Sequence, residues 1–253
     1  MITFTEAQLM AWLSPVLWPF LRILAVFTAA PVFSSRAFPV RARIALAFLV
    51  AFAAQDGLPA TSLVGLDDAG VWGVVVQQVG IGLALGFAVR LVFAAVDLAG
   101  EVIGFQMGLN FASFFDPSLN SQSSAVARFF SQMTSLLFVV MNGHLMVLMA
   151  VNKSFEAFPV DQNFLQALGK MKLYQLGTDL FASALWMALP MIGMLMFVNM
   201  ALGVISRVAP QMNIFAVGFP ITLVVGLMGI AYTLPMLDQP FLALMDRVID
   251  IFG

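Results

Sequence analysis

Two carboxylates stand four residues apart in an otherwise apolar part of the chain, and their types and spacing could support chemistry. Asp97 and Glu101 share one face of a helix, so they repel each other unless a cation or a proton intervenes. Arg90 precedes Asp97 by about two helical turns and is the nearest cation in sequence. Two interpretations stay open for these charges: buried pairing between helices, or a step coupled to a proton or another ion.

Two further charges, Arg22 and Arg207, also lie at apolar depth. A charge at the centre of a bilayer costs about 2.5–3.5 kcal/mol on insertion scales. Both side chains are therefore expected to face protein or water and to pair.

His144 is the only histidine, and the chain has no cysteine. A zinc site would need carboxylates from distant parts of the chain, so we expect His144 to pack or to form a hydrogen bond. The sequence has no nucleophile elbow and no acid–base arrangement around His144, and the glycines of residues 80–86 lack the spacing of a dinucleotide fingerprint. We predict no enzyme, no metal and no cofactor.

The composition defines the environment of these residues. Of the 253 residues, 62% are hydrophobic and 9% are charged, whereas a soluble domain has about 25% charged residues. This indicates an integral membrane protein, with residues 1–253 as one membrane domain. A net charge of −2 without a basic patch gives no indication of nucleic-acid binding.

Six apolar segments must position the charges, and a span takes about 20 apolar residues. The second segment has about half that length and is interpreted as re-entrant or buried. The positive-inside rule then favours five spans, with the N-terminus outside, over six. The segments are residues 11–32, 44–54, 71–96, 129–151, 181–205 and 214–237, followed by an amphipathic tail, 238–253.

A glycine face accompanies the two carboxylates within residues 97–117. Gly100, Gly104 and Gly108 recur every fourth residue, and such a face lets another helix approach closely. We expect a helix that runs into Asn110 and docks against a neighbouring segment through these glycines.

Three aromatic rings follow this helix: Phe111, Phe114 and Phe115. The dipeptide Asp116-Pro117 then ends the element, because the residue before proline avoids helical geometry. Two interpretations stay open for the rings: ordinary core packing, or an aromatic constriction that closes a pore by excluding water.

Several blocks of sequence, read together, resemble the FliR family of the bacterial type III export apparatus and its injectisome relatives. The likeness covers nearly the whole chain, and residues 207–213 are its most specific part. The blocks are residues 18–22, 30–33, 104–108, 111–117, 142–145, 207–215 and 218–220.

This resemblance implies a fold and a function. Family members are all-α, built of kinked helical hairpins, and lie in the bacterial inner membrane at the flagellar basal body. One copy joins FliP- and FliQ-like membrane subunits in a helical hetero-oligomeric gate, which exports unfolded proteins with further export-apparatus proteins. The resemblance therefore implies a subunit of a protein-export channel rather than an enzyme.

The resemblance also implies roles for residues. The loop matching residues 110–115 forms part of a plug that closes the resting pore, with Met107 nearby. Asn110 replaces a common serine, and Phe115 stands where relatives often have an aliphatic residue. A polar anchor between subunits or helices is implied for three further residues: Arg207, Gln211 and Asn213.

Two other functions stay open from the residues alone. Arg90, Asp97 and Glu101 around broken helices could serve a stand-alone secondary transporter. A membrane scaffold without a transport path is the third possibility. A transporter would act alone and bind a small solute, whereas a gate subunit would need its sister subunits.

Overall fold

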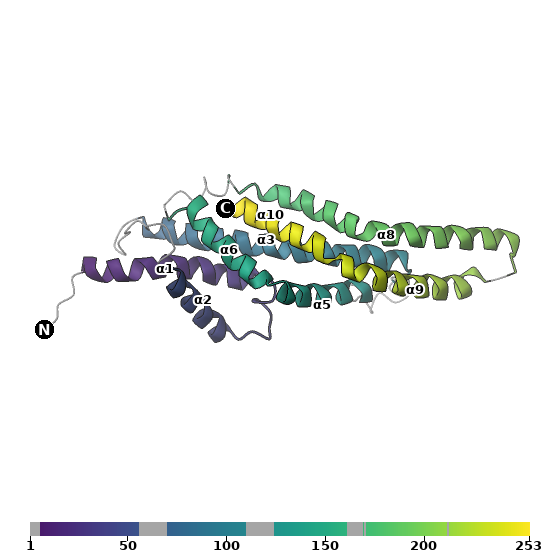
Figure 1. Cartoon of the computed structure of the whole chain (residues 1–253), viewed down its shortest axis with the longest axis horizontal. Helices are drawn as coiled ribbons and strands as arrows, with labels where there is room; N and C mark the ends of the chain where they lie inside the picture. Colours follow the sequence, from purple (N-terminus) through teal and green to yellow (C-terminus); the bar gives the residue numbers. More distant parts are fainter. Residues whose placement is uncertain (1–5, 56–69, 110–123, 161–168, 170, 212) are drawn as a thin grey trace. The chain divides into compact units, whose positions relative to one another are not determined.

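The computed structural model describes residues 6–55, 70–109, 124–160, 169, 171–211 and 213–253. The predicted all-helical fold is confirmed there, since these ranges contain helices and no strand (Figure 1). The helices are α1 (Glu6–Ala29), α2 (Val40–Ala54), α3 (Val71–Gln106), α5 (Ala125–Val140), α6 (Gly143–Ala157), α8 (Leu173–Val208), α9 (Ile214–Thr233), the 3-10 helix η3 (Leu234–Met236) and α10 (Asp238–Phe252).

Three helical stretches are long and apolar enough to cross a membrane. They are Val71–Gln106, Leu173–Val208 and Ala216–Met236, and the bent pair α5 and α6 would make a fourth span. The apolar part of α1, Leu13–Ala29, is shorter than a span. The described residues therefore give three or four candidate spans, against the five or six that hydropathy predicts.

The fourth apolar segment is one helix in the prediction and two helices in the structure. α5 and α6 meet at an angle of 69°. Asn142 adopts a left-handed backbone conformation (φ 56°), which interrupts the helix, and Gly143 begins the next one. The break is local backbone geometry, which apolar composition does not reveal.

Two other boundaries differ from the prediction. α3 continues without a break past residue 96, so the stretch with Asp97 and Glu101 is the end of a 36-residue helix. α8 begins at Leu173 and runs through Pro190 without interruption. The carboxylates after residue 96 do not end α3, and Pro190 does not end α8. Proline is tolerated in an apolar helix when packed neighbours surround it.

The chain divides into two compact units. The first contains Met1–Leu91, Val139–Gly177 and Met245–Gly253, and the second contains Val92–Phe138 and Thr178–Leu244. In the first unit, α1 runs parallel to α3. A Cβ on Gly86 would come within 2.6 Å of the Ala29 Cβ, and Gly82 lies against the backbone of Arg22. Glycines on α3 thus permit close helix contact.

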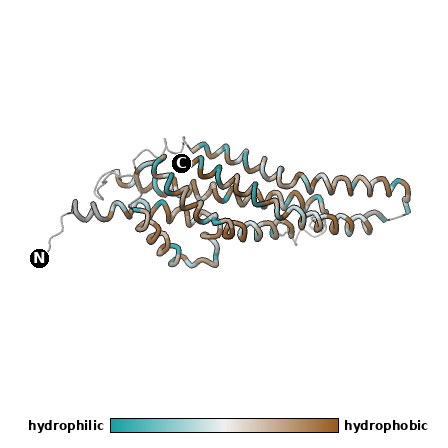
Figure 2. Tube along the Cα trace, viewed as in Figure 1, coloured by the Kyte–Doolittle hydropathy of each residue, from teal (hydrophilic) through white to brown (hydrophobic). Residues whose placement is uncertain are grey.

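The second unit contains the end of α3 together with α5, α8, α9 and the start of α10. α8 and α9 form a hairpin, as the approach of Gly218 to Leu202 and of Gly229 to Met191 shows. Both helices are largely hydrophobic along their length (Figure 2). In an apolar stretch of 18 residues in α8, only 22% is buried, against 61% in a stretch of the same length in α3. The hairpin therefore presents apolar surface to its surroundings, whereas α3 is a packed helix.

Candidate functional site

The candidate site is the place where α3 ends, in the second unit. Gly108 has φ 78°, its N–H donates to the Phe105 carbonyl oxygen (3.0 Å), and the Leu109 N–H donates to that of Gly104 (3.1 Å). This hydrogen-bond pattern is a Schellman motif, in which a glycine with positive φ closes a helix. The helix therefore ends at Gln106, and Gly108 lies beyond it rather than on the glycine face predicted from spacing.

Met107 fixes this helix end against α9. Its side chain is fully buried. A Cβ on Gly226 would lie 2.6 Å from the Met107 Cγ and Cε atoms, so the thioether occupies a notch left by glycine. The Thr222 hydroxyl proton is shared between the Phe219 carbonyl oxygen of its own helix (3.0 Å) and the Met107 carbonyl oxygen (3.3 Å). The chain thus leaves α3 from a point held by α9.

Gly100 and Gly104 lie against α5. A Cβ on Gly100 would be 2.8 Å from the Cα of Ala127, and a Cβ on Gly104 would be 2.7 Å from the Oγ of Ser124. α5 therefore runs antiparallel to α3, and its start lies beside Gly104. Since Leu109 also bonds to Gly104, residues 110–123 leave and rejoin the described structure at the same turn of α3.

The predicted plug residues Asn110, Phe111, Phe114 and Phe115 lie outside the described residues. Their role stays a prediction. What the structure describes is their attachment: Met107 and Leu109 on one side, and Ser124 on the other.

The two carboxylates of α3 bond to α5. Glu101 Oε1 accepts the backbone N–H of Ser124 at 2.7 Å, and the Asp97 carboxylate is hydrogen-bonded to the Ser131 side chain. Asp97 Oδ1 is buried and has no hydrogen-bond partner among the described atoms. The partner of Asp97 is therefore the Ser131 side chain of α5. Arg90, the cation nearest in sequence, is exposed.

Arg22 lies in the first unit and is fully buried. Its Nε donates to Gln78 Oε1 (2.9 Å), Nη1 to the carbonyl oxygen (2.7 Å) and Oγ (3.0 Å) of Ser154, and Nη2 to the Phe158 carbonyl oxygen (2.8 Å). The Phe155 ring lies 3.7 Å from the guanidinium carbon. Arg22 thus bonds neutral oxygens and joins α1, α3 and the C-terminal end of α6, where a cation is favourable.

The predicted polar anchor lies around the turn between α8 and α9. Arg207 is exposed in the last turn of α8, and Gln211 is exposed within the turn. Asn213 Oδ1 accepts the N–H of Ala216 (3.4 Å), so this side chain caps the start of α9. The structure brings these residues to one end of the hairpin (Figure 1), and their role between subunits stays a prediction.

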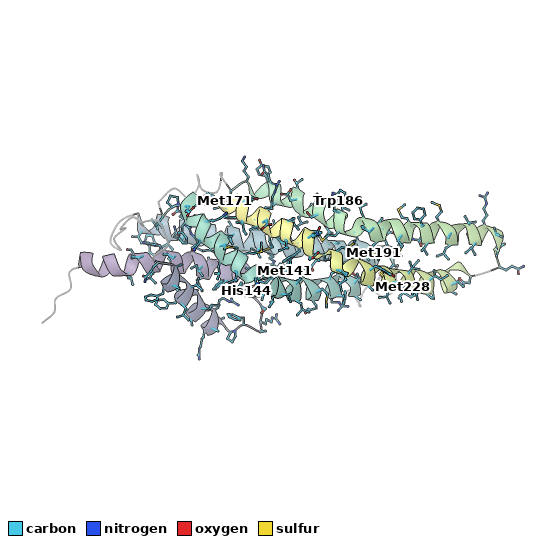
Figure 3. The ribbon with its side chains drawn as sticks, viewed as in Figure 1. Met141, His144, Met171, Trp186, Met191 and Met228 are labelled. Atoms are coloured by element: carbon cyan, nitrogen blue, oxygen red, sulfur yellow. The ribbon has the colours of Figure 1, made fainter. Side chains whose placement is uncertain are left out.

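The contacts of several residues near the site were not predicted from the sequence. Ser124 precedes an apolar helix, a pattern typical of an N-cap, and its Oγ accepts the N–H of Ala127 (3.1 Å). Thr222 gives no sequence signal. Methionines also fill glycine notches: a Cβ on Gly229 would meet the thioether sulfur of Met191. Met191 lies on α8 along the hairpin in Figure 3.

His144 is partly buried at the start of α6, where Figure 3 labels it. In the part of the chain that the structure describes, no group of three or more histidine, aspartate or glutamate side chains could hold a metal ion. The contacts that the structure describes at the end of α3 are hydrogen bonds and packing contacts.

A family model described as "Bacterial export proteins, family 1" matches residues 13–248. The chain is 41% identical over 253 residues to the flagellar biosynthetic protein FliR of Pectobacterium carotovorum subsp. carotovorum, covering 100% of this chain and 97% of the relative. It is 39% identical over 241 residues to FliR of Escherichia coli K12 (95% and 92% covered) and 32% identical over 212 residues to FliR of Bacillus subtilis 168 (81% and 80% covered).

Proposed function

Since the chain belongs to the FliR family of bacterial export proteins, we propose that it is a core subunit of the flagellar type III export gate. It lies in the inner membrane at the flagellar basal body and joins FliP- and FliQ-like subunits and further export-apparatus proteins. Together they form the channel for unfolded flagellar proteins. The chain itself catalyses no reaction.

The exposed apolar surface of the α8–α9 hairpin supports assembly within a membrane. Trp186 and Phe197 of α8 are each 74% exposed, and Tyr232 of α9 is 84% exposed. Burial stabilises apolar surface by about 25 cal/mol per Å², so these side chains need lipid or another subunit to cover them. This surface fits a subunit whose partners complete its packing.

The residues from Asn110 to Phe115 act as a plug in the resting channel. The observation that carries this proposal is that the chain leaves α3 at Leu109 and returns at Ser124, both beside Gly104. Three phenylalanines on a segment with fixed ends supply a large apolar area that excludes water and ions.

A stand-alone transporter built on Arg90, Asp97 and Glu101 has less support. Arg90 is exposed, and both carboxylates already bond to groups at the start and middle of α5. Nothing in this arrangement favours a small solute over protein substrate.

Shortening the segment tests the proposed plug. Deletion of residues 110–115 is expected to make cells with the assembled gate leak ions, measured as membrane conductance. A deletion of equal length within residues 161–168 serves as the control, and it is expected to leave conductance at the wild-type level. Unchanged conductance after deletion of residues 110–115, in a gate that still assembles, would refute the plug.

A further inference from the structure

The first turn of α5 has an incomplete set of capping groups within its own sequence. Ser124 occupies the N-cap position, and its Oγ accepts the N–H of Ala127 at 3.1 Å. In a capping box, a carboxylate three residues after the N-cap accepts the N-cap N–H in return. Position 127 is alanine, which offers no such acceptor. The Ser124 N–H must find its acceptor elsewhere.

Glu101 of α3 supplies the missing acceptor. Its Oε1 accepts the Ser124 N–H at 2.7 Å, a short bond to a charged group, which is the stronger kind. A carboxylate at the N-terminus of a helix is also favoured by the helix dipole. α3 therefore completes the cap of α5, although the two residues are 23 positions apart.

The glycine face makes this contact possible. A Cβ on Gly104 would lie 2.7 Å from Ser124 Oγ, and a Cβ on Gly100 would lie 2.8 Å from the Cα of Ala127. A side chain at position 100 would meet the Ala127 backbone and push the start of α5 away from α3, and one at position 104 would displace the Ser124 side chain. The glycines thus set the distance, and Glu101 makes the hydrogen bond across it.

Different side chains hold the chain at the two ends of residues 110–123. The upstream one depends on Met107, which Thr222 and Gly226 hold against α9. The downstream one depends on the bond between Glu101 and Ser124. Loss of Glu101 would remove this hydrogen bond and leave the contacts of Met107 with α9 in place.

We propose that Glu101 is a positioning residue, which fixes the point where residues 110–123 rejoin the helices. Its importance for ion retention rests on the proposed function of that segment as a plug. Its effect on the start of α5 does not depend on the plug, so the two ideas can be tested separately.

The first measurement is amide hydrogen exchange at Ser124–Ala127 in the full-length protein in detergent. Glu101→Ala is expected to speed exchange by about tenfold, because a hydrogen bond to a charged group is lost. Glu101→Gln keeps an oxygen acceptor and is expected to restore most of the protection. Glu156→Ala, at an exposed glutamate of α6, is the control and is expected to exchange like the wild type.

Gly104→Ala provides a second variant with Glu101 intact. Its Cβ displaces Ser124, so the same amides are expected to exchange faster. Exchange at wild-type rates in Glu101→Ala would overturn the proposal. If Glu101→Ala does not fold, Gly104→Ala decides. Faster exchange in Gly104→Ala would support the contact between α3 and Ser124, and exchange at the wild-type rate would overturn the proposal.

The second measurement is ion conductance of cells with the assembled gate. Glu101→Ala is expected to leak and Glu101→Gln to retain ions. If the variant lacking residues 110–115 leaks while Glu101→Ala does not, the positioning role is wrong and the plug stands. If exchange is faster in Glu101→Ala but neither variant leaks, the plug is wrong and Glu101 still holds the start of α5.

Discussion

Gly100 of α3 and Ala127 of α5 are so close that a methyl group on Gly100 would lie 2.8 Å from the Ala127 Cα atom. Side-chain atoms do not approach a backbone atom so closely, and backbone cannot move aside as the end of a flexible side chain can. The contact therefore requires glycine, and it sets the separation of the helices that carry Glu101 and Ser124.

Gly100→Ala is accordingly expected to lower the free energy of unfolding by about 1–3 kcal/mol, because an extra methyl group overpacks the contact. The measurement is SDS-induced unfolding in detergent micelles. Gly203→Ala in α8 is the matched control, since nothing lies within 4 Å of that position. Alanine there is expected to gain up to about 1 kcal/mol in helix propensity. Equal effects of the two substitutions would contradict the close packing of α3 and α5.

Arg22→Ala is expected to cost about 3 kcal/mol or more of unfolding free energy. The substitution leaves oxygens of Gln78, Ser154 and Phe158 without their donor in a buried place. Arg22→Lys is expected to be intermediate, because a single ammonium nitrogen cannot reach oxygens arranged around a planar guanidinium.

Arg90→Ala is the control for Arg22, since Arg90 is exposed. Its effect is expected to stay within about 0.5 kcal/mol. If the Arg22→Ala and Arg90→Ala proteins had the same free energy of unfolding, the Arg22 hydrogen bonds would contribute little to the stability of the first unit.

Arg207→Ala is expected to weaken assembly of the gate without lowering the stability of the isolated chain. Arg207 is exposed at the end of α8, so its loss removes little from the chain itself, whereas a partner subunit would lose a charged contact. Size-exclusion chromatography of the co-expressed complex measures the effect. Recovery of the full-sized complex with this substitution would contradict the anchor.

The sequence predicts the close helix contact but not its extent. Gly100 and Gly104 at four-residue spacing indicate a face without side chains, and α5 lies against it. Gly108 continues the same spacing, yet it closes the helix with φ 78°. The spacing of glycines does not distinguish a helix face from a helix end, because both uses depend on the absence of a Cβ.

The partners of the charged residues could not be predicted from residue types. Arg22 bonds two backbone carbonyl oxygens, and Glu101 bonds a backbone N–H. Every residue has a backbone carbonyl and every residue except proline has a backbone N–H, so only the fold shows which of these groups lie close to a charge. The sequence indicated that the buried charges need partners, and backbone groups at helix ends provide several of them for Arg22 and Glu101.

Native mass spectrometry of the detergent-extracted protein, co-expressed with FliP- and FliQ-like subunits, tests the central claim most directly. The account predicts one copy of this chain in a large hetero-oligomer that contains both partners. A monomer or a homodimer that does not bind those partners would contradict the proposed role as a gate subunit.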